Sequence, residues 1–225
     1  MKIIGHIETD FNTKFGVPRQ SGLCDELHGR IVFESEYRVA EAFRGLEDFS
    51  HIWVLWKFSE AEREDWSPTV RPPRLGGNKK MGVFATRSPF RPNNIGLSCV
   101  KLDKISYDEK DSPVLYISGI DMMNGTPVYD IKPYVPVADC RSDAADGFTS
   151  QTKDYSLNVT DENNLLSAFP EEKRSGALRM LSLDPRPSYI NDENRVFGVE
   201  YAGFDIRFTV KENELNIIEV IQIKN

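Results

Sequence analysis

The sequence has few of the residues from which metal centres and disulfide frameworks are built. Its 225 residues include three cysteines and three histidines. Cys24, Cys99 and Cys140 show no CxxC spacing, and their odd number argues against a disulfide framework. The histidines and cysteines form no cluster with the spacing of a metal site. We therefore expect no metal and a reducing compartment, the cytoplasm.

Long apolar stretches and the common enzyme signatures are also missing. No run approaches the ~20 residues of a membrane-spanning helix, and the start, MKIIGHIETDF, contains no apolar segment of a secretory signal. The motifs GxGxxG after a strand, GxxxxGK(S/T), HExxH and GxSxG do not occur. The sequence thus predicts no membrane partner, and it argues against the nucleotide-binding and hydrolase folds that carry these motifs.

Positive charge is scarce over the whole chain but concentrated in one stretch. The net charge of −7 argues against a general nucleic-acid coat or a membrane-surface binder. Between Arg63 and Arg91, however, seven basic residues stand against two acids. A local basic surface is enough to bind phosphate, so this stretch predicts a nucleic-acid contact, although a solvated loop is the alternative. The candidate RNA contacts are Arg71, Arg74, Lys79, Lys80, Arg91 and, from a later Pro-Arg-Pro stretch, Arg186.

The stretch 82–97, GVFATRSPFRPNNIGL, is the most informative in the chain. Residues 82–86 predict a short buried strand, and the following loop, 87–94, contains two arginines, two prolines and two asparagines. Proline restricts the backbone, and a rigid loop suits a clamp in which arginine forks hold an anion. A tight surface loop with arginines for solubility explains the same composition equally well. Pro18-Arg19-Gln20 repeats the pattern of a fixed turn, an arginine and an amide.

The first part of the chain, 1–145, is predicted to be mainly β. Strands are expected at 2–8, 29–34, 49–58, 97–105, 114–120 and 128–132, with a helix at 37–46. Short strands joined by turns favour a barrel or a sandwich over a doubly wound sheet. Asn124-Gly125 marks a turn, where Asp121 and Asn124 either hold ribose hydroxyls or an amine or serve the turn alone. His51 opens the third strand, a place where a satisfied polar residue is more common than a catalyst.

The remainder, 146–225, is predicted to be a small α+β domain. Two helical patterns lie within 162–183, and three strands follow at 195–201, 204–210 and 215–223. Turns are expected at 202–203 and 212–213, so the strands form an antiparallel meander packed on the two helices.

Two long motifs carry a resemblance to a known family. FATRSPFRPNNIGLS at 84–98 and GTPVYDIKPY at 125–134 resemble the two signatures of the TsaA-like family, also called YaeB/VirR or TrmO-type tRNA N6-methyltransferases. LDPRPSY at 183–189 resembles the tail domain of the bacterial members. The resemblance covers nearly the whole chain, and one departure stands out: Asn124 occupies a position where the family commonly has Asp.

The resemblance implies a non-Rossmann β-barrel that binds S-adenosylmethionine and a homodimer with the cofactor near the subunit interface. It also implies methylation of N6 of threonylcarbamoyladenosine at position 37 in threonine tRNA, and hence a tRNA anticodon loop as partner. By motif position the cofactor contacts would be Pro18, Arg19, Gln20, His51, Ile52, Arg87, Leu97, Asp121, Met122, Met123, Asn124, Gly125 and Thr126. No catalytic residue is assigned.

The chemistry of methyl transfer is consistent with this pattern. Transfer from a sulfonium is an in-line displacement that depends mainly on positioning, which is worth ~7–11 kcal/mol. A catalytic dyad is therefore not required. The alternatives are a non-catalytic S-adenosylmethionine-sensing or RNA-binding module, and a structural protein whose arginine loop joins two subunits.

Overall fold

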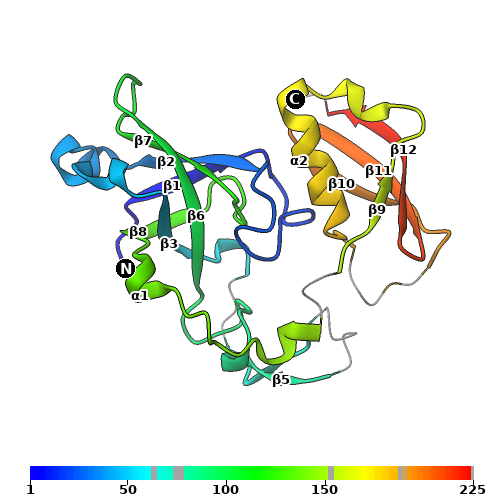
Figure 1. The fold of residues 1–225 in the computed structure, drawn as a ribbon, viewed down its shortest axis with the longest axis horizontal. Helices are drawn as coiled ribbons and strands as arrows, with labels where there is room; N and C mark the ends of the chain where they lie inside the picture. Colours follow the sequence, from blue (N-terminus) through cyan, green and yellow to red (C-terminus); the bar gives the residue numbers. More distant parts are fainter. Residues whose placement is uncertain (62–64, 73–78, 152–154, 187–189, 191, 224–225) are drawn as a thin grey trace.

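Alternating apolar residues close the first half of the chain into a six-stranded antiparallel barrel (Figure 1). The structure, a computed structural model, describes residues 1–225 except 62–64, 73–78, 152–154, 187–189, 191 and 224–225. The strand order around the barrel is β1-β2-β7-β6-β3-β8. The bounds are β1 Gly5–Thr9, β2 His28–Phe33, β3 His51–Lys57, β6 Ile95–Ser106, β7 Val114–Ser118 and β8 Pro127–Pro133. The predicted barrel is therefore confirmed.

Strand β3 shows why the sheet closes. Ile52, Val54 and Trp56 are buried and alternate with partly exposed neighbours. β3 pairs with β6 on one side and β8 on the other, so its apolar face points into the barrel. Burying a large apolar side chain stabilises the fold by roughly 1.5–3 kcal/mol. The first strand differs most from its prediction, because it begins at Gly5 and leaves Ile3 39% exposed.

The helix predicted over 37–46 is wrong. The segment forms three short 3-10 helices instead, with bounds Ser35–Tyr37, Ala40–Phe43 and Leu46–Asp48. Phe43 packs on Phe33, with ring centroids 4.9 Å apart, but Val39 is 50% exposed. A short α-helix depends on packing a whole apolar face. This face is only partly covered, and Gly45 breaks the turn at a φ of 84°.

The buried strand predicted at 82–86 is also wrong. β5, Met81–Gly82, pairs with β4, Thr69–Val70, and then gives way to a 3-10 helix at Val83–Ala85. The Thr86 hydroxyl donates to the Val83 carbonyl at 2.9 Å, a local bond that competes with strand pairing. Val83 is buried, but the two residues after it, Phe84 and Ala85, are both exposed, so the side chains do not alternate as strand residues facing a core would.

The C-terminal sheet has one strand more than predicted. Its order is β10-β11-β12-β9, with β9 parallel to β12. The expected meander is confirmed; three-residue β9 is too short to stand out in the sequence. The second predicted helix is α2, whereas the first is a 3-10 helix, Leu165–Ala168. The bounds are β9 Asn158–Thr160, α2 Glu171–Ser182, β10 Phe197–Tyr201, β11 Phe204–Lys211 and β12 Glu214–Gln222.

Short elements fill the connections between these sheets. They are a 3-10 helix Ser59–Ala61, the helix α1 Pro136–Asp139 and a 3-10 helix Gly147–Gln151. Among the residues that the structure describes, no helix is long and apolar enough to cross a membrane.

A single apolar core joins the barrel to the C-terminal sheet. Phe11, in the loop after β1, lies 5.2 Å from the ring of Tyr201 in β10, and both are buried. The Lys173 ammonium bonds to the Asp10 carboxylate, and the Ala202 amide donates to the Asp10 carbonyl at 3.2 Å. The loop after β1 is therefore held between the two sheets.

Gly16 marks the closest approach within this junction. Its φ is +96°, and a Cβ there would lie 2.3 Å from Cγ2 of Val199. Gly22 in the same loop also has positive φ, at +73°, but a Cβ there would meet no described atom within 4 Å.

We predict that Gly16→Ala destabilises the protein more than Gly22→Ala does. Both substitutions introduce left-handed strain, so their difference isolates the clash with Val199, about 1–3 kcal/mol for overpacking. Urea unfolding monitored by circular dichroism measures both. Equal losses for the two variants would show that the junction at Gly16 is loosely packed.

Candidate cofactor-binding site

The site is built where strand β6 continues beyond strand β7. Pairing between them begins at Lys101 and Ser118, so the earlier residues of β6 extend past the end of β7. Two loops occupy this edge. The Cys99 amide donates to the Ser21 hydroxyl at 3.1 Å, and the Gly22 amide donates to the Gly119 carbonyl at 2.9 Å. Loop 18–22 thus replaces β7 as the neighbour of β6.

Leu97 lies on this same edge. It is two residues before Cys99, and backbone groups two residues apart on a strand point to the same side. Its side chain is 50% exposed. The predicted site residue Leu97 therefore lies on the part of β6 that β7 does not pair with.

A buried polar chain leads from the barrel interior to this edge. The Trp56 indole N–H donates to the Ser98 hydroxyl at 2.9 Å, and that hydroxyl donates to Oδ1 of Asp121 at 2.6 Å. Ser98 is 0% exposed. Gly96 leaves room for the indole, since a Cβ there would lie 2.2 Å from the Trp56 ring. The carboxyl group of Asp121 is thus fixed from inside the barrel.

Burial raises the pKa of Asp121 from 3.8 to about 6. Hydrogen bonds from the Ser98 hydroxyl and the Ser21 backbone oppose the shift, and so does the positive charge of Arg87. Asp121 is consequently ionised near neutral pH and becomes neutral under mildly acidic conditions.

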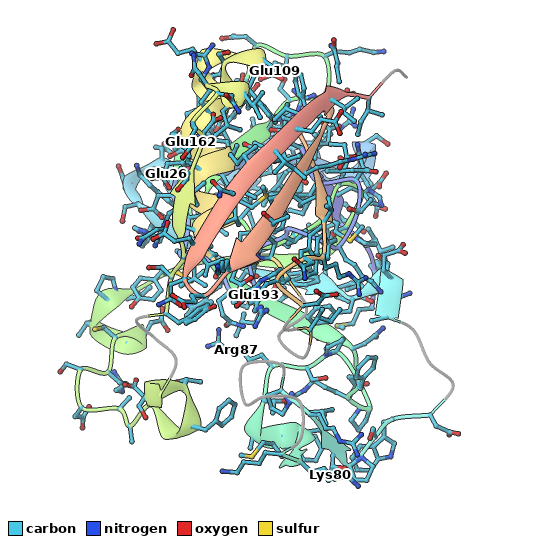
Figure 2. All side chains as sticks on the ribbon, turned by 90° about the vertical axis from the view of Figure 1, so that its right-hand side faces the viewer. Glu26, Lys80, Arg87, Glu109, Glu162 and Glu193 are labelled. Carbon is cyan, nitrogen blue, oxygen red and sulfur yellow. The ribbon has the colours of Figure 1, made fainter. Side chains whose placement is uncertain are left out.

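Arg87 and Gln20 join the two clamp-like loops. Nη1 of Arg87 donates to Oε1 of Gln20 at 2.5 Å, and Nε2 of Gln20 donates to the Arg19 carbonyl at 2.6 Å. Arg87 is exposed. In Figure 2 it lies between the C-terminal sheet, above it, and the part of the chain that contains Lys80, below it. The structure therefore brings Arg87, Gln20 and Asp121 together from three loops.

The C-terminal domain reaches the same place through Arg186. Nη2 of Arg19 donates to the Arg186 carbonyl at 3.2 Å. The Arg186 guanidinium is bound by Asp184 at 2.8 and 3.0 Å, and both side chains are 12% exposed. Tyr155 also donates to Asp184 at 2.8 Å. Arg186 thus braces this loop, a role that fits its burial better than the predicted RNA contact.

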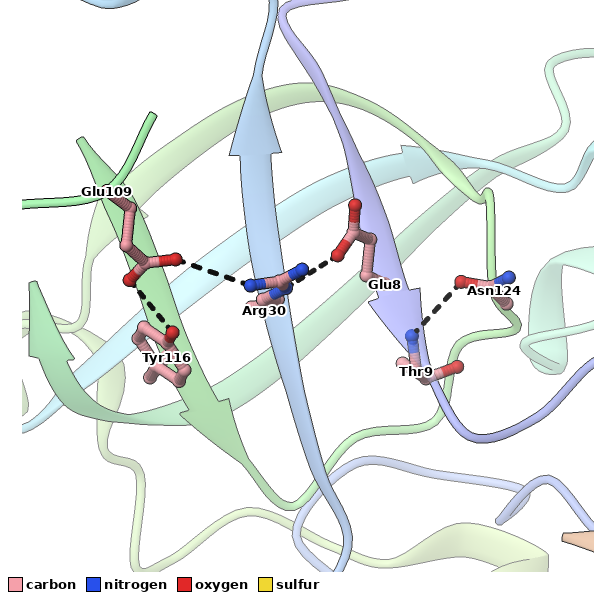
Figure 3. Close-up of polar contacts among 6 residues, drawn as sticks. All are labelled: Glu8, Thr9, Arg30, Glu109, Tyr116 and Asn124. Carbon is pink, nitrogen blue, oxygen red and sulfur yellow. Dashed lines mark hydrogen bonds and ion pairs between the residues drawn. The ribbon is translucent and has the colours of Figure 1, made fainter. Parts of the chain in front are cut away.

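The predicted site residues that follow Asp121 serve mainly the turn. Met122 and Thr126 are 1% and 4% exposed, and Met123 is half-buried. Oδ1 of Asn124 accepts the Thr9 amide at 3.2 Å (Figure 3), and Gly125 has a φ of 77°. An aspartate at 124 would accept the Thr9 amide in the same way, so the observed Asn preserves this contact.

Figure 3 also shows a paired cation on the neighbouring barrel face. Arg30 lies between Glu8, at 2.5 Å, and Glu109, at 3.3 Å. Hydrogen bonds from Ser106 and Tyr116 lower the pKa of Glu109. With two carboxylates beside it, Arg30 is already neutralised, whereas the Arg87 guanidinium donates to the uncharged amide of Gln20.

Other predicted site residues do not join the Arg87 cluster within one chain. Ile52 is 0% exposed inside the barrel, as strand alternation requires. His51 lies five residues from Trp56 on β3, a separation of about 16 Å along a strand. Its Nδ1 contacts the Ser50 hydroxyl at 2.9 Å. Pro18 is buried, unlike its exposed neighbour Arg19.

The predicted RNA contacts divide into two kinds. Arg71, Lys79 and Lys80 are exposed beside strands β4 and β5, whereas Arg74 lies outside the described residues. Nη1 of Arg91 donates to the carbonyls of Thr86, at 2.6 Å, and Val83, at 3.1 Å. Arg91 is therefore used at least partly to hold its own loop.

Trp56, Ser98 and Ser21 are not among the site residues predicted from the sequence. A signal for Ser98 exists in the alternation along 96–100, which places a lone hydroxyl on the buried face of a strand. Ser21 and Trp56 show no comparable signal, because their contacts join distant segments.

Comparison with known proteins identifies the family. Residues 6–140 match the model of the tRNA-methyltransferase O N-terminal domain, and residues 164–223 match the TrmO C-terminal domain. The chain belongs to the tRNA-methyltransferase O family. The N-terminal match contains Gln20, Arg87 and Asp121, and the C-terminal match contains Arg186.

Relatives of the tRNA-methyltransferase O family support this membership over most of the chain. The tRNA (adenine(37)-N6)-methyltransferase of Escherichia coli is 41% identical over 220 residues, 93% of this chain and 92% of its own length. A putative S-adenosylmethionine-dependent methyltransferase of Pseudomonas aeruginosa is 38% identical, over 91% of this chain and 90% of its own. A crystal structure of TrmO from Pseudomonas aeruginosa superposes with a TM-score of 0.76 at 31% identity, covering 97% and 96% of the two chains.

We predict that Asp121→Asn removes one pH dependence of stability. Because the pKa of Asp121 is raised in the folded protein, the native state binds a proton between about pH 6 and 4 that the unfolded state does not. The wild type should therefore gain stability relative to the variant as pH falls from 7 to 4, by at most about 3 kcal/mol.

Urea unfolding at pH 4, 5, 6 and 7 measures this difference. Asp130→Asn is the matched control, since Asp130 pairs with Lys132 at 2.8 Å on the outside of β8. Parallel stability profiles for wild type and Asp121→Asn would contradict the prediction.

Proposed function

We propose that this protein is an S-adenosylmethionine-dependent tRNA methyltransferase that acts on N6 of adenosine 37. The finer substrate is threonylcarbamoyladenosine in threonine tRNA, as the two signature motifs imply. The observation that carries the proposal is the meeting of Arg87, Gln20 and Asp121 at the edge of a non-Rossmann barrel. The names of the relatives from Escherichia coli and Pseudomonas aeruginosa support the same activity and cofactor.

The charges at this edge fit the proposed cofactor. S-adenosylmethionine has a carboxylate at one end and two positive groups, an ammonium and a sulfonium. Arg87 offers a guanidinium to the carboxylate, and Asp121 offers a carboxylate to a positive group. The two charges come from different loops, and Gln20 holds Arg87 in place.

When bound, S-adenosylmethionine supplies a methyl group on a positively charged sulfur. The chain's own contribution is positioning. Ser98 and Trp56 fix the carboxylate of Asp121, Gln20 fixes Arg87, and the C-terminal loop fixes Arg19. Rigid groups lose little entropy on binding, and that is how an active site without a catalytic dyad lowers a barrier.

We propose that the basic segment, residues 63–91, binds tRNA. Arg71, Lys79 and Lys80 are exposed, and Arg74 belongs to the same stretch of sequence. We infer that they bind phosphates of the anticodon loop, whose single-stranded bases can be splayed into a site. A homodimer in the cytoplasm completes the proposal; these two statements rest on the resemblance and on the cysteine content.

We predict that Arg87→Ala weakens S-adenosylmethionine binding about 10- to 100-fold, the range expected for a lost hydrogen bond to a charged group. Isothermal titration calorimetry measures the affinity. The control is Arg207→Ala, which removes a similarly exposed ion-paired arginine on the C-terminal sheet. Unchanged affinity in Arg87→Ala would remove Arg87 from the site.

We predict that the protein transfers methyl groups to tRNA. Total tRNA from cells that lack this activity is incubated with labelled S-adenosylmethionine, and the nucleosides are analysed by mass spectrometry. A gain of about 14 daltons on threonylcarbamoyladenosine is expected. Saturable cofactor binding without transfer would instead indicate a sensing module, and neither binding nor transfer would indicate a structural protein.

A further inference from the structure

Two large aromatic side chains lie exposed next to the basic segment. Phe84 is 69% exposed and Trp66 is 47% exposed. Their rings stack on each other, with centroids 6.0 Å apart and planes 25° apart. Large apolar side chains that gather on a surface mark an interaction site more often than isolated ones do. We call Trp66 and Phe84 the aromatic pair.

The backbone around the aromatic pair is held firmly. The Val83 amide donates to the Pro68 carbonyl at 3.0 Å, and the Ser67 amide donates to the Phe90 carbonyl at 3.2 Å. These bonds tie the segment of Trp66 to the segment of Phe84, beside the β4–β5 ribbon. Val83 is 1% exposed and anchors the turn from which Phe84 projects.

Arg91 supports the pair as well. Its guanidinium donates to the carbonyls of Thr86 and Val83, and its Cζ lies 5.5 Å from the centre of the Phe84 ring. A guanidinium over an aromatic face is attracted to the ring. The rings are thus presented in a fixed arrangement, which lowers the entropic cost of binding a flat partner.

The charge around the aromatic pair selects the partner. Over the described residues of 65–94, five cations stand against one acid, Asp65, although the whole chain has a net charge of −7. Arg71, Lys79 and Lys80 are exposed in this segment, and Figure 2 shows Lys80 at its outer end. Aromatic faces combined with cations match single-stranded nucleic acid, which offers bases and phosphates together. A second copy of this acidic chain is a less complementary partner.

We propose that the aromatic pair is a stacking platform for one unpaired base of the RNA substrate, with Arg71, Lys79 and Lys80 holding the adjoining phosphates. This inference rests on the proposed tRNA substrate. It adds a contact distinct from the Arg87 site: the flat faces of Phe84 and Trp66 hold a loop nucleotide, while the barrel edge holds the cofactor. The contact tolerates any base, because every base has an aromatic face.

The test is an affinity cycle between side chain and base, measured by fluorescence anisotropy without S-adenosylmethionine. The probes are an anticodon stem-loop RNA and a series in which one loop nucleotide at a time is abasic. Phe84→Ala and Trp66→Ala should each weaken binding of the intact stem-loop about 5- to 150-fold. Phe84→Trp, which keeps a ring, should bind like the wild type.

One abasic position should weaken binding to the wild type by at least fivefold and leave the affinity of Phe84→Ala unchanged. The Ala variants should retain the salt dependence of the wild type. The double variant Lys79→Ala/Lys80→Ala should lower that dependence and keep the abasic effect. Circular dichroism and light scattering establish that each variant is folded and has the wild-type mass.

Equal RNA affinity in Phe84→Ala and wild type overturns the proposal, as does the loss of a dimer in Phe84→Ala without any abasic effect. The second result would assign the aromatic pair to a subunit contact. RNA binding is measured without the cofactor, so its result does not depend on methyl transfer. Failure of methyl transfer would therefore refute the proposed function, whereas the stacking platform is tested by the RNA affinities alone.

Discussion

The hydroxyl of Ser98 is the contact on which the site depends. It accepts a hydrogen bond from a buried indole and passes one to Asp121, so it couples the packing of the barrel to the charge at its edge. A buried hydroxyl without partners would cost roughly 1–3 kcal/mol. Here the Ser98 hydroxyl both accepts and donates a hydrogen bond, and the carboxyl group of Asp121 is held in one orientation. The same burial raises the pKa of Asp121. The side chain is partly withdrawn from water because it sits against the barrel interior.

The C-terminal sheet acts on the site through a loop that belongs to the barrel. Phe11 and Asp10 are held by β10 and α2, and Gly16 passes close to Val199 before the chain reaches Gln20. At the far end of the loop, Arg19 meets the Arg186 carbonyl. The C-terminal domain thereby fixes both ends of the segment that supports Arg87. It thus contributes to the geometry of the candidate site.

The sequence predicts the barrel well because strands buried on one face repeat every two residues, as Ile52, Val54 and Trp56 do. The prediction fails at 37–46 and 82–86, where hydrogen bonds within turns and partial exposure determine the backbone conformation.

The motifs place Gln20, Arg87 and Asp121 in one site, and the structure brings them together. Ile52 shows the limit of the motif: a match by position does not say which face of a strand a residue occupies, whereas the alternation with Val54 and Trp56 places Ile52 inside the barrel. The contact of Arg186 with Asp184 was equally beyond reach, since a stretch of Pro, Arg and Pro is compatible with both a brace and a phosphate contact.

The unequal lengths of β6 and β7 have a consequence for how such a site can evolve. This edge is free of strand pairing with β7 because β7 stops at Ser118 while β6 continues back to Ile95. Backbone groups of β6 along this edge turn to loops instead of to a strand, as the Cys99 amide does. Continuing β7 beyond Ser118 along β6 would replace the contact of loop 18–22 with the Cys99 amide by sheet pairing, without changing any charged side chain of the candidate site. Conversely, shortening the strand next to β6 in a barrel without these side chains would expose the same backbone N–H and C=O groups of β6. The end of β7 therefore decides whether this edge is available to loops, and side chains such as Arg87 and Gln20 are carried there by those loops.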